Sequence, residues 1–319
     1  MTPIDNAFLL ANFGLEKPEV SLDDGSVLSA MRVVRHVPLK RCVCHARWQG
    51  LPVYVKLFFG DKAAQYASRD VSGVESLQSA NILTPKILHQ GELKQLKAVA
   101  VVFEEVVDSK NAEAVWLGAA ESERLTLAKQ LVQTVAEHHE AGLVQTDLYL
   151  KNFLIKHDDI YTIDGDGIRH FNDLPKQKAL DNVSQLLSKF DVLMLDQYLP
   201  VLLNGYAKVR VWRESPSAVE IKKRADVARR KATVSYADNK VFRQCTDVNV
   251  VKTKYVFAAI RSHYSTLALP QNPVALDACV TSENIIKDGN TCTVALAKVD
   301  NLSVVIKRYN IKGFWHGLG

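Results

Sequence analysis

VQTDLYLKNFLI, the stretch from Val144 to Ile155, places Asp147 and Asn152 inside an otherwise apolar and aromatic run. A few residues further on, YTIDGDG ends a β-like segment with two more aspartates. Charged side chains are rarely buried unless they are paired or hold a metal. The stretch therefore poses a choice between the acids of a solvated loop and the acids of a metal- and phosphate-binding site.

Length and composition predict a soluble globular protein with a sizeable core. The chain has 319 residues, of which 47% are hydrophobic and 24% are charged. At about 150 residues per domain, this length is enough for roughly two domains. The net charge of +5 is compatible with an anionic substrate, a nucleic acid or an anionic membrane surface, and it selects none of them.

Cysteine usage and hydropathy indicate the cellular compartment in which the protein is expected. The five cysteines form no CxxC pair, which predicts reduced, mostly buried thiols in a cytoplasmic protein. The N-terminus has no basic segment before its short apolar run, so it does not resemble a signal peptide. No stretch reaches the roughly 18 uncharged apolar residues of a transmembrane helix, and any membrane contact is expected to be peripheral.

Apolar periodicity predicts an α+β chain with two lobes, in which the acids cluster near the junction of the lobes. The expected strands span 28–36, 41–48, 52–59, 97–106, 153–156 and 159–164, and the expected helices span 61–79, 122–140 and 178–190. Gln49-Gly50 predicts a hairpin turn. Ser122 is the expected N-cap of the second helix, and His138 and His139, near the end of that helix, are expected to be structural.

Residues 213–240 are unusually basic and predict a helical segment with few large apolar residues. The basic side chains are Lys222, Lys223, Arg224, Arg229, Arg230 and Lys231. A solvated linking helix and a peripheral contact with an anionic membrane surface both fit this pattern. Nucleic-acid binding is not favoured, because no aromatic residues interleave the cluster. The expected domains are 1–212, divided near residue 106, then a linker over 213–248 and a second domain over 249–319.

An internal repeat is suggested near the C-terminal end of the sequence. Without gaps, CTVALAKVDNLSVVIK (292–307) aligns with RCVCHARWQGLPVYVK (41–56), and five of the 16 positions are identical. The identical pairs are Val43/Val294, Ala46/Ala297, Leu51/Leu302, Val53/Val304 and Lys56/Lys307. The second copy stops soon after its third expected strand, so we expect the sequence to end inside a longer tandem protein.

One lysine in this pattern has the features of a phosphate-binding residue. Phosphoryl transfer requires a cation on the nucleotide phosphates. Lys56 lies on an apolar strand, where an unpaired ammonium group would be costly to bury. Glu75, or its rival Asp70, lies on the following helix and is the expected ionic partner. Glu104, in the next buried strand, completes the residues expected to bind the cofactor.

The aspartates and the asparagine supply the remaining chemistry. Mg²⁺ prefers oxygen ligands and usually keeps several waters, so one or two carboxylates are sufficient. Asp147 and Asn152 are five residues apart, and Asp164 follows Asn152 by 12 residues. We expect Asp147 to be the catalytic base and Asn152, Asp164 and Asp166 to be metal ligands. A simple turn at Asp164 and Asp166 is the alternative.

These residues carry a resemblance to a known family. HHEAGLVQTDLYLKNFLIKHDDIYTIDGDGIRHF (138–171) resembles the bacterial lipopolysaccharide core kinases, the Kdo and heptose kinases. VVIKRYNIKGFWHGL (304–318) looks like the lysine-bearing strand of such kinases. The resemblance covers about residues 25–245 and implies a protein-kinase-like fold, with an antiparallel N-terminal lobe and a mostly helical C-terminal lobe. A partial second N-terminal lobe would follow, as in a tandem-domain member.

The resemblance also implies an activity. Lys56 would contact the phosphates of ATP with Glu75 as its partner, Asp147 would be the base, and Asn152 and Asp164 would hold Mg²⁺. The γ-phosphoryl group would pass to a sugar hydroxyl of the lipid A–core oligosaccharide, at the cytoplasmic face of the inner membrane of a Gram-negative cell. A kinase of proteins or small molecules and a non-catalytic kinase-like scaffold in envelope biogenesis are the alternatives.

Three positions depart from the pattern of protein kinases. Gln145 and Thr146 stand where His-Arg usually precedes the catalytic aspartate. Gly165 and Asp166 stand where Phe-Gly usually follows the metal-binding aspartate. HVPLKR (36–41) occupies the position of the glycine-rich loop that normally surrounds the phosphates.

Overall fold

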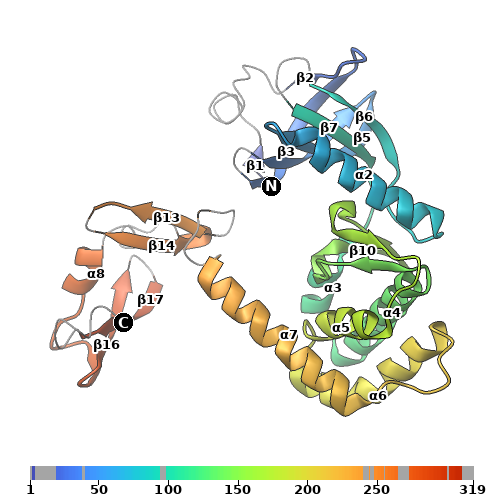
Figure 1. Cartoon of the computed structure of the whole chain (residues 1–319). Helices are drawn as coiled ribbons and strands as arrows, with labels where there is room; N and C mark the ends of the chain where they lie inside the picture. Colours follow the sequence, from blue (N-terminus) through green and yellow to red (C-terminus); the bar gives the residue numbers. More distant parts are fainter. Residues whose placement is uncertain are drawn as a thin grey trace. The chain divides into compact units, whose positions relative to one another are not determined.

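The computed structural model is a mixed α+β protein (Figure 1). It describes residues 2–3, 19–37, 40–93, 98–239, 244, 248–254, 256–264, 273–299 and 302–310. The chain divides into two compact units, Met1–Thr233 and Val234–Gly319. Within the described residues, no helix combines the length and the apolar character needed to cross a membrane.

The first unit begins with an antiparallel seven-stranded sheet, in which the strand order is β1-β3-β4-β5-β7-β6 and β2 pairs with β3. The strands are β1 (Thr2–Pro3), β2 (Val20–Ser21), β3 (Val27–Val37), β4 (Arg41–Trp48), β5 (Leu51–Phe59), β6 (Ile87–Glu92) and β7 (Ala98–Glu104). Gln49 and Gly50 both have positive φ, 50° and 81°. This confirms the predicted hairpin turn, since paired positive φ values match the twist of the flanking strands.

Helix α2 (Ala63–Ser79) packs against this sheet and confirms the helix predicted over 61–79 (Figure 1). Ala67 and Val74 are buried on its inner side, where they meet Phe58 of β5 and the apolar side chains of β7. The near-continuous apolar sequence of β7 follows from its position in the sheet, between β5 and β6 and under the helix.

The remainder of the first unit is mostly helical, and its helices share one large apolar core. They are α3 (Ala112–Gly118), α4 (Glu121–Glu140), α5 (Lys176–Leu187), α6 (Val192–Val209) and the first part of α7 (Ala218–Asn239). The expected N-cap of α4, Ser122, is wrong by two residues. The N-cap is Ala120, whose backbone amide donates to the carboxylate of Glu123 at 2.7 Å.

Short strand pairs lie among these helices and carry the acidic segments. β10 (Phe153–Lys156) pairs with β11 (Asp159–Thr162) and with β8 (Lys110–Asn111). β9 (Leu143–Gln145) pairs with β12 (Ile168–His170). Two single turns of 3-10 helix, η1 (Leu150–Asn152) and η2 (Gly165–Gly167), lie directly beside these strands.

The basic segment differs from the expected solvated linker, because its first part belongs to the first unit. Ile221 and Ala225 are four residues apart and fully buried in the helical core. Arg224 pairs with Glu220 and Asp181. The first unit therefore extends to Thr233, beyond the expected boundary at residue 212, because two apolar positions of α7 supply one face of its core.

The second unit contains the hairpin β13 (Val248–Lys252) and β14 (Phe257–Arg261), helix α8 (Pro273–Ala278) and a three-stranded antiparallel sheet. The strands of that sheet are β15 (Ile285–Asp288), β16 (Cys292–Val299) and β17 (Leu302–Tyr309). Residues 311–319, at the end of the expected second domain, lie outside the described residues.

The predicted repeat is visible in strand register. Val294 pairs with Lys307 just as Val43 pairs with Lys56, and the ends of the two hairpins match as well. The preceding strand in each copy carries a register shift at the equivalent point, between Val33 and Arg35 in β3 and between Ile285 and Lys287 in β15. The sequence similarity therefore corresponds to a repeated meander of three strands.

Candidate functional site

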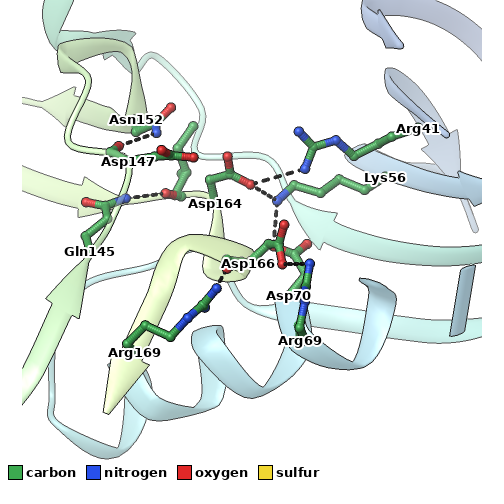
Figure 2. Close-up of polar contacts among 11 residues, drawn as sticks. Arg41, Lys56, Arg69, Asp70, Gln145, Asp147, Asn152, Asp164, Asp166 and Arg169 are labelled. Atoms are coloured by element: carbon green, nitrogen blue, oxygen red, sulfur yellow. Dashed lines mark hydrogen bonds and ion pairs between the residues drawn. The ribbon is translucent and has the colours of Figure 1, made fainter. Parts of the chain in front are cut away.

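Lys56 connects the sheet to the acidic segment of the first unit. Its Nζ lies 2.7 Å from Oδ1 of Asp70 and 3.0 Å from Oδ1 of Asp164 (Figure 2). Burial alone would lower the pKa of this ammonium group, but the two carboxylates outweigh burial and raise the pKa above its ordinary value. Lys56 is therefore charged at neutral pH and fixed in direction by two acids far apart in the sequence.

The helix partner of Lys56 is Asp70, the rival candidate, and the expectation for Glu75 is wrong in this structure. Asp70 is fully buried, whereas Glu75 is exposed on the same helix. Five residues correspond to about 140° of rotation around an α-helix, so the two side chains cannot face the same strand. Asp70 Oδ1 also accepts the backbone amide of Asp166 at 3.0 Å.

Two glycines bring helix α2 into direct backbone contact with η2. A Cβ atom on Gly73 would lie 2.0 Å from the carbonyl oxygen of Gly165, and one on Gly165 would lie 2.1 Å from the carbonyl oxygen of Asp70. Neither position can therefore carry a side chain without moving backbone. This contact explains why a glycine follows Asp164 here and how Asp70 and Asp164 reach the same ammonium group.

Asp164 adopts a left-handed backbone conformation, with φ of 75°, at the start of this turn. Its carboxylate receives Lys56 and also lies 3.6 Å from Nη1 of Arg41. Burial would raise the pKa of Asp164, but Lys56, Arg41 and Arg35 lower it below its ordinary value. The carboxylate is therefore ionised at neutral pH, as a metal ligand has to be.

A side-chain hydrogen bond from Asn152 holds together the loop that contains Asp147 and Asn152. Asn152 is buried, and its Nδ2 donates to the carbonyl oxygen of Asp147 at 2.8 Å. The amide of Ile163 donates to the carbonyl oxygen of Asn152 at 2.9 Å, which joins the loop to the residue before Asp164. Figure 2 shows Asp164 between Lys56 on one side and Asp147 and Asn152 on the other.

Gln145 and Thr146 hold the acidic turn that carries Asp164 through hydrogen bonds to its backbone. Gln145 is buried, and its Nε2 donates to the carbonyl oxygen of Ile163 at 3.0 Å. The backbone amide and the hydroxyl of Thr146 both donate to the carbonyl oxygen of Gly167, at 2.8 and 3.0 Å. The two residues that depart from the kinase pattern therefore fix both ends of the turn that carries Asp164.

A buried polar network continues from this point into the helices. Asn182 donates to the carbonyl oxygen of Gln145 at 2.9 Å and contacts His139, which also contacts the Tyr206 hydroxyl at 2.7 Å. Burial lowers the pKa of His139 to about 4 and that of His138 to about 3. Both rings are neutral at physiological pH and occupy core positions, as expected for structural histidines.

Two other expected site residues have different neighbours. The carboxylate of Asp166 pairs with Arg69 Nη2 at 2.8 Å, so it faces a cation and not the loop of Asn152. Glu104 accepts the backbone amide of Lys86 at 2.9 Å, at the end of β7. The structure thus joins Asp70 and Asp164 through Lys56, and the loop of Asp147 and Asn152 lies on the other side of Asp164 (Figure 2).

The donor set fits a divalent cation that keeps most of its waters. Asp164 offers an ionised carboxylate, and the Asn152 amide uses its nitrogen towards Asp147, so its oxygen is not part of that bond. Hard oxygen ligands of this kind suit Mg²⁺. In the described part of the chain, one group of three His, Cys, Asp or Glu side chains has its ligand atoms close enough together to hold a metal ion. It consists of Asp23, Asp24 and His89 and is separate from this site.

Arg41 was not assigned a role from the sequence. Its ion pair with Asp164 depends on the pairing of β4 with β5, which brings residue 41 to the same edge of the site as Lys56. The only signal in the sequence was the basic HVPLKR segment in place of a glycine-rich loop.

Comparisons with protein-family models and with curated protein sequences give no match. The function is therefore argued from the residues and geometry of the site.

Proposed function

We propose that this protein is an ATP-dependent phosphotransferase with a protein-kinase-like fold. The observation that carries the proposal is the Lys56 ammonium group, held between Asp70 of α2 and Asp164 of the acidic turn. A largely buried lysine at a strand centre that is shared by a helix acid and a loop acid is an arrangement that positions nucleotide phosphates beside a metal ligand. The antiparallel sheet and the helical core would be the two lobes.

Each side chain would have a defined task. Bound ATP with Mg²⁺ would supply the γ-phosphoryl group. Lys56 would bind phosphate oxygens, with Asp70 fixing its direction. Asn152 and Asp164 would hold the metal through oxygen atoms. The exposed carboxylate of Asp147 would accept the proton of the acceptor hydroxyl.

The acceptor that we propose is a sugar hydroxyl of the lipid A–core oligosaccharide, reached at the cytoplasmic face of the inner membrane. This part rests on the resemblance of residues 138–171 to lipopolysaccharide core kinases. A peripheral membrane contact through the basic segment would use the exposed Lys223, Arg230 and Lys231. Lys222 and Arg224 are less suited, because they pair with Asp196 and Asp181.

The test is ATP turnover with Mg²⁺ by the full chain, with purified core oligosaccharide and a generic protein as rival acceptors. Asp147→Asn should lower transfer by roughly a hundredfold or more, the usual contribution of a general base, and should leave ATP affinity nearly unchanged. Asp158→Asn, at an exposed aspartate of the β10–β11 turn, is the matched control.

Four results would change the proposal. Turnover with protein but not with oligosaccharide would overturn the acceptor and keep the reaction class. Full activity of Asp147→Asn would overturn the role of that residue. An absence of turnover, with a nucleotide-induced rise in melting temperature, would favour a non-catalytic nucleotide-binding scaffold. An absence of both would overturn the reaction class.

A further inference from the structure

Arg41 is the first residue of β4 and points into the site beside Lys56 (Figure 2). β4 and β5 are paired so that Arg41 lies opposite Phe58, two positions beyond Lys56. Its guanidinium nitrogen lies 3.6 Å from the same Asp164 oxygen that Lys56 contacts at 3.0 Å. Two cations from neighbouring strands therefore converge on one carboxylate oxygen.

The geometry of this ion pair leaves the guanidinium group available. At 3.6 Å the contact with Asp164 is longer than a hydrogen bond. A guanidinium group carries five N–H donors in a planar fork that matches two phosphate oxygens at once. The Arg41 side chain is about one-fifth exposed, so a ligand can reach it from solvent.

The sequence before Arg41 has no glycine-rich motif of the kind that usually binds phosphate. Glycine-rich turns bind phosphates through backbone amides that approach the oxygens closely. The segment HVPLKR contains no glycine, and Pro38 has no N–H group to donate. The amide of Lys40 is already used, since it donates to the carbonyl oxygen of Val37 at 3.1 Å.

We propose that Arg41 is a phosphate-binding residue that replaces the backbone amides of a glycine-rich loop. This inference rests on the proposed function, because the ligand is the phosphate chain of the bound nucleotide. Without nucleotide, Arg41 pairs with Asp164. With nucleotide, its fork binds phosphate oxygens beyond the first phosphate. The second meander has Cys292 at the equivalent position, so the arginine is not a feature of the repeated hairpin itself.

The experiment measures equilibrium binding of MgATP, MgADP and AMP to the full chain, for the wild type and for Arg41→Gln and Arg41→Lys. In Arg41→Gln, the dissociation constants of MgATP and MgADP should rise by roughly tenfold to a hundredfold, the loss expected for charge-assisted hydrogen bonds. The AMP constant should change less than about twofold, because AMP lacks the phosphates in question. Arg41→Lys should restore part of the affinity, because lysine keeps the charge and loses the fork.

Arg47→Gln is the matched control, because Arg47 lies on the same strand and donates to the carbonyl oxygen of Gly50 at the far end. It should bind all three nucleotides like the wild type. Binding of MgATP by Arg41→Gln with wild-type affinity, or equal losses for MgATP and AMP, would overturn the inference. If the wild type binds neither MgATP nor MgADP, the proposed function fails first, and this is seen before any variant is compared.

Discussion

The two copies of the three-stranded meander differ in what covers them. Both have the same hairpin register and a bulge at the same point of the first strand. In the first copy, β5 pairs with β7 and lies beneath α2, and Val55 is fully buried. In the second copy, the strand β17 is largely exposed, with Val305 at 64% and Tyr309 at 70% exposure.

The lysine position belongs to the repeated hairpin, whereas the contacts that surround the lysine differ between the two copies. The equivalent lysines, Lys56 and Lys307, lie at the same register position of the same kind of strand. Lys56 contacts two carboxylates, whereas Lys307 is exposed and lies over the ring of Tyr309 at 4.8 Å. The hairpin supplies a lysine at a defined position, and the helix and the acidic turn convert that lysine into part of a site.

The largest difference between the two copies is expected for replacement of these lysines. Lys56→Met should leave the buried Asp70 carboxylate without its cation, remove one of the two cations on Asp164, and destabilise the first unit by about 3 kcal/mol. It should also abolish the phosphoryl transfer that we propose. Lys307→Met should change neither the protection of β17 nor the activity. Hydrogen–deuterium exchange at β5 and β17 measures the two effects separately, and equal effects would contradict the comparison.

Glycines provide the next test. Gly165→Ala would force a Cβ atom against the carbonyl oxygen of Asp70, and overpacking of this kind costs about 3 kcal/mol. Gly289→Ala, in the turn between β15 and β16, would meet its nearest atom, the carbonyl oxygen of Cys292, at 3.2 Å and should cost much less. Thermal unfolding followed by circular dichroism measures the change. A stable Gly165→Ala protein would show that α2 and η2 are not held in backbone contact.

Acid should weaken the first unit through its buried histidines. In the unfolded chain, histidines bind protons below about pH 6.5, but in the fold His138 and His139 do so only near 3 and 4. The unfolded state therefore binds more protons between these values, and stability falls as the pH is lowered from 6.5.

At pH 5 the loss is about 2 kcal/mol per histidine. Asp164 does not contribute in this window, because its carboxylate is ionised there both in the unfolded chain, with an ordinary pKa of 3.8, and in the fold, where the pKa is lower. Urea unfolding at several pH values between 5 and 7.5, monitored by hydrogen exchange in α4, measures the slope of the unfolding free energy against pH. Replacing both histidines with glutamine should remove most of that slope, and an unchanged slope would assign it to other groups.

The smallest expected effect concerns the apolar positions just before the two lysines. Val55→Ala opens space in a covered sheet and should cost about 1.5 kcal/mol. Ile306→Ala removes more atoms, yet its side chain is partly exposed, so the cost should be smaller. Exchange protection of β5 and β17 gives both values. A larger loss in β17 would mean that the second sheet is covered as well as the first.

The sequence was sufficient for features that depend on neighbouring residues. Gln49-Gly50 predicted its turn, and the apolar pattern of 61–79 predicted α2 to within two residues at its start. The repeat was visible as five identical positions, and the strand registers agree with it. The α+β class follows from the same local patterns.

Features that depend on contacts between distant segments were not predictable in the same way. The choice between Asp70 and Glu75 depends on the rotation of α2 about its axis, which the contact of Gly73 with Gly165 fixes. Arg41 enters the site through strand pairing. The apolar positions of α7 are few and stand among charges whose partners, Asp181 and Asp196, lie on other helices.

The two neighbouring thiols of β4, Cys42 and Cys44, can be used to detect opening of the sheet. Cys42 and Cys44 are fully buried with their sulfur atoms 3.5 Å apart, and this contact and burial raise the pKa of Cys44. Thiolates, not thiols, react with alkylating reagents. Cys279 and Cys292 are half-buried and react first, and Cys245 lies outside the described residues. Once these are blocked, the rate of further alkylation follows the opening of the strand that carries Arg41, and it equals the opening rate when alkylation is faster than reclosing.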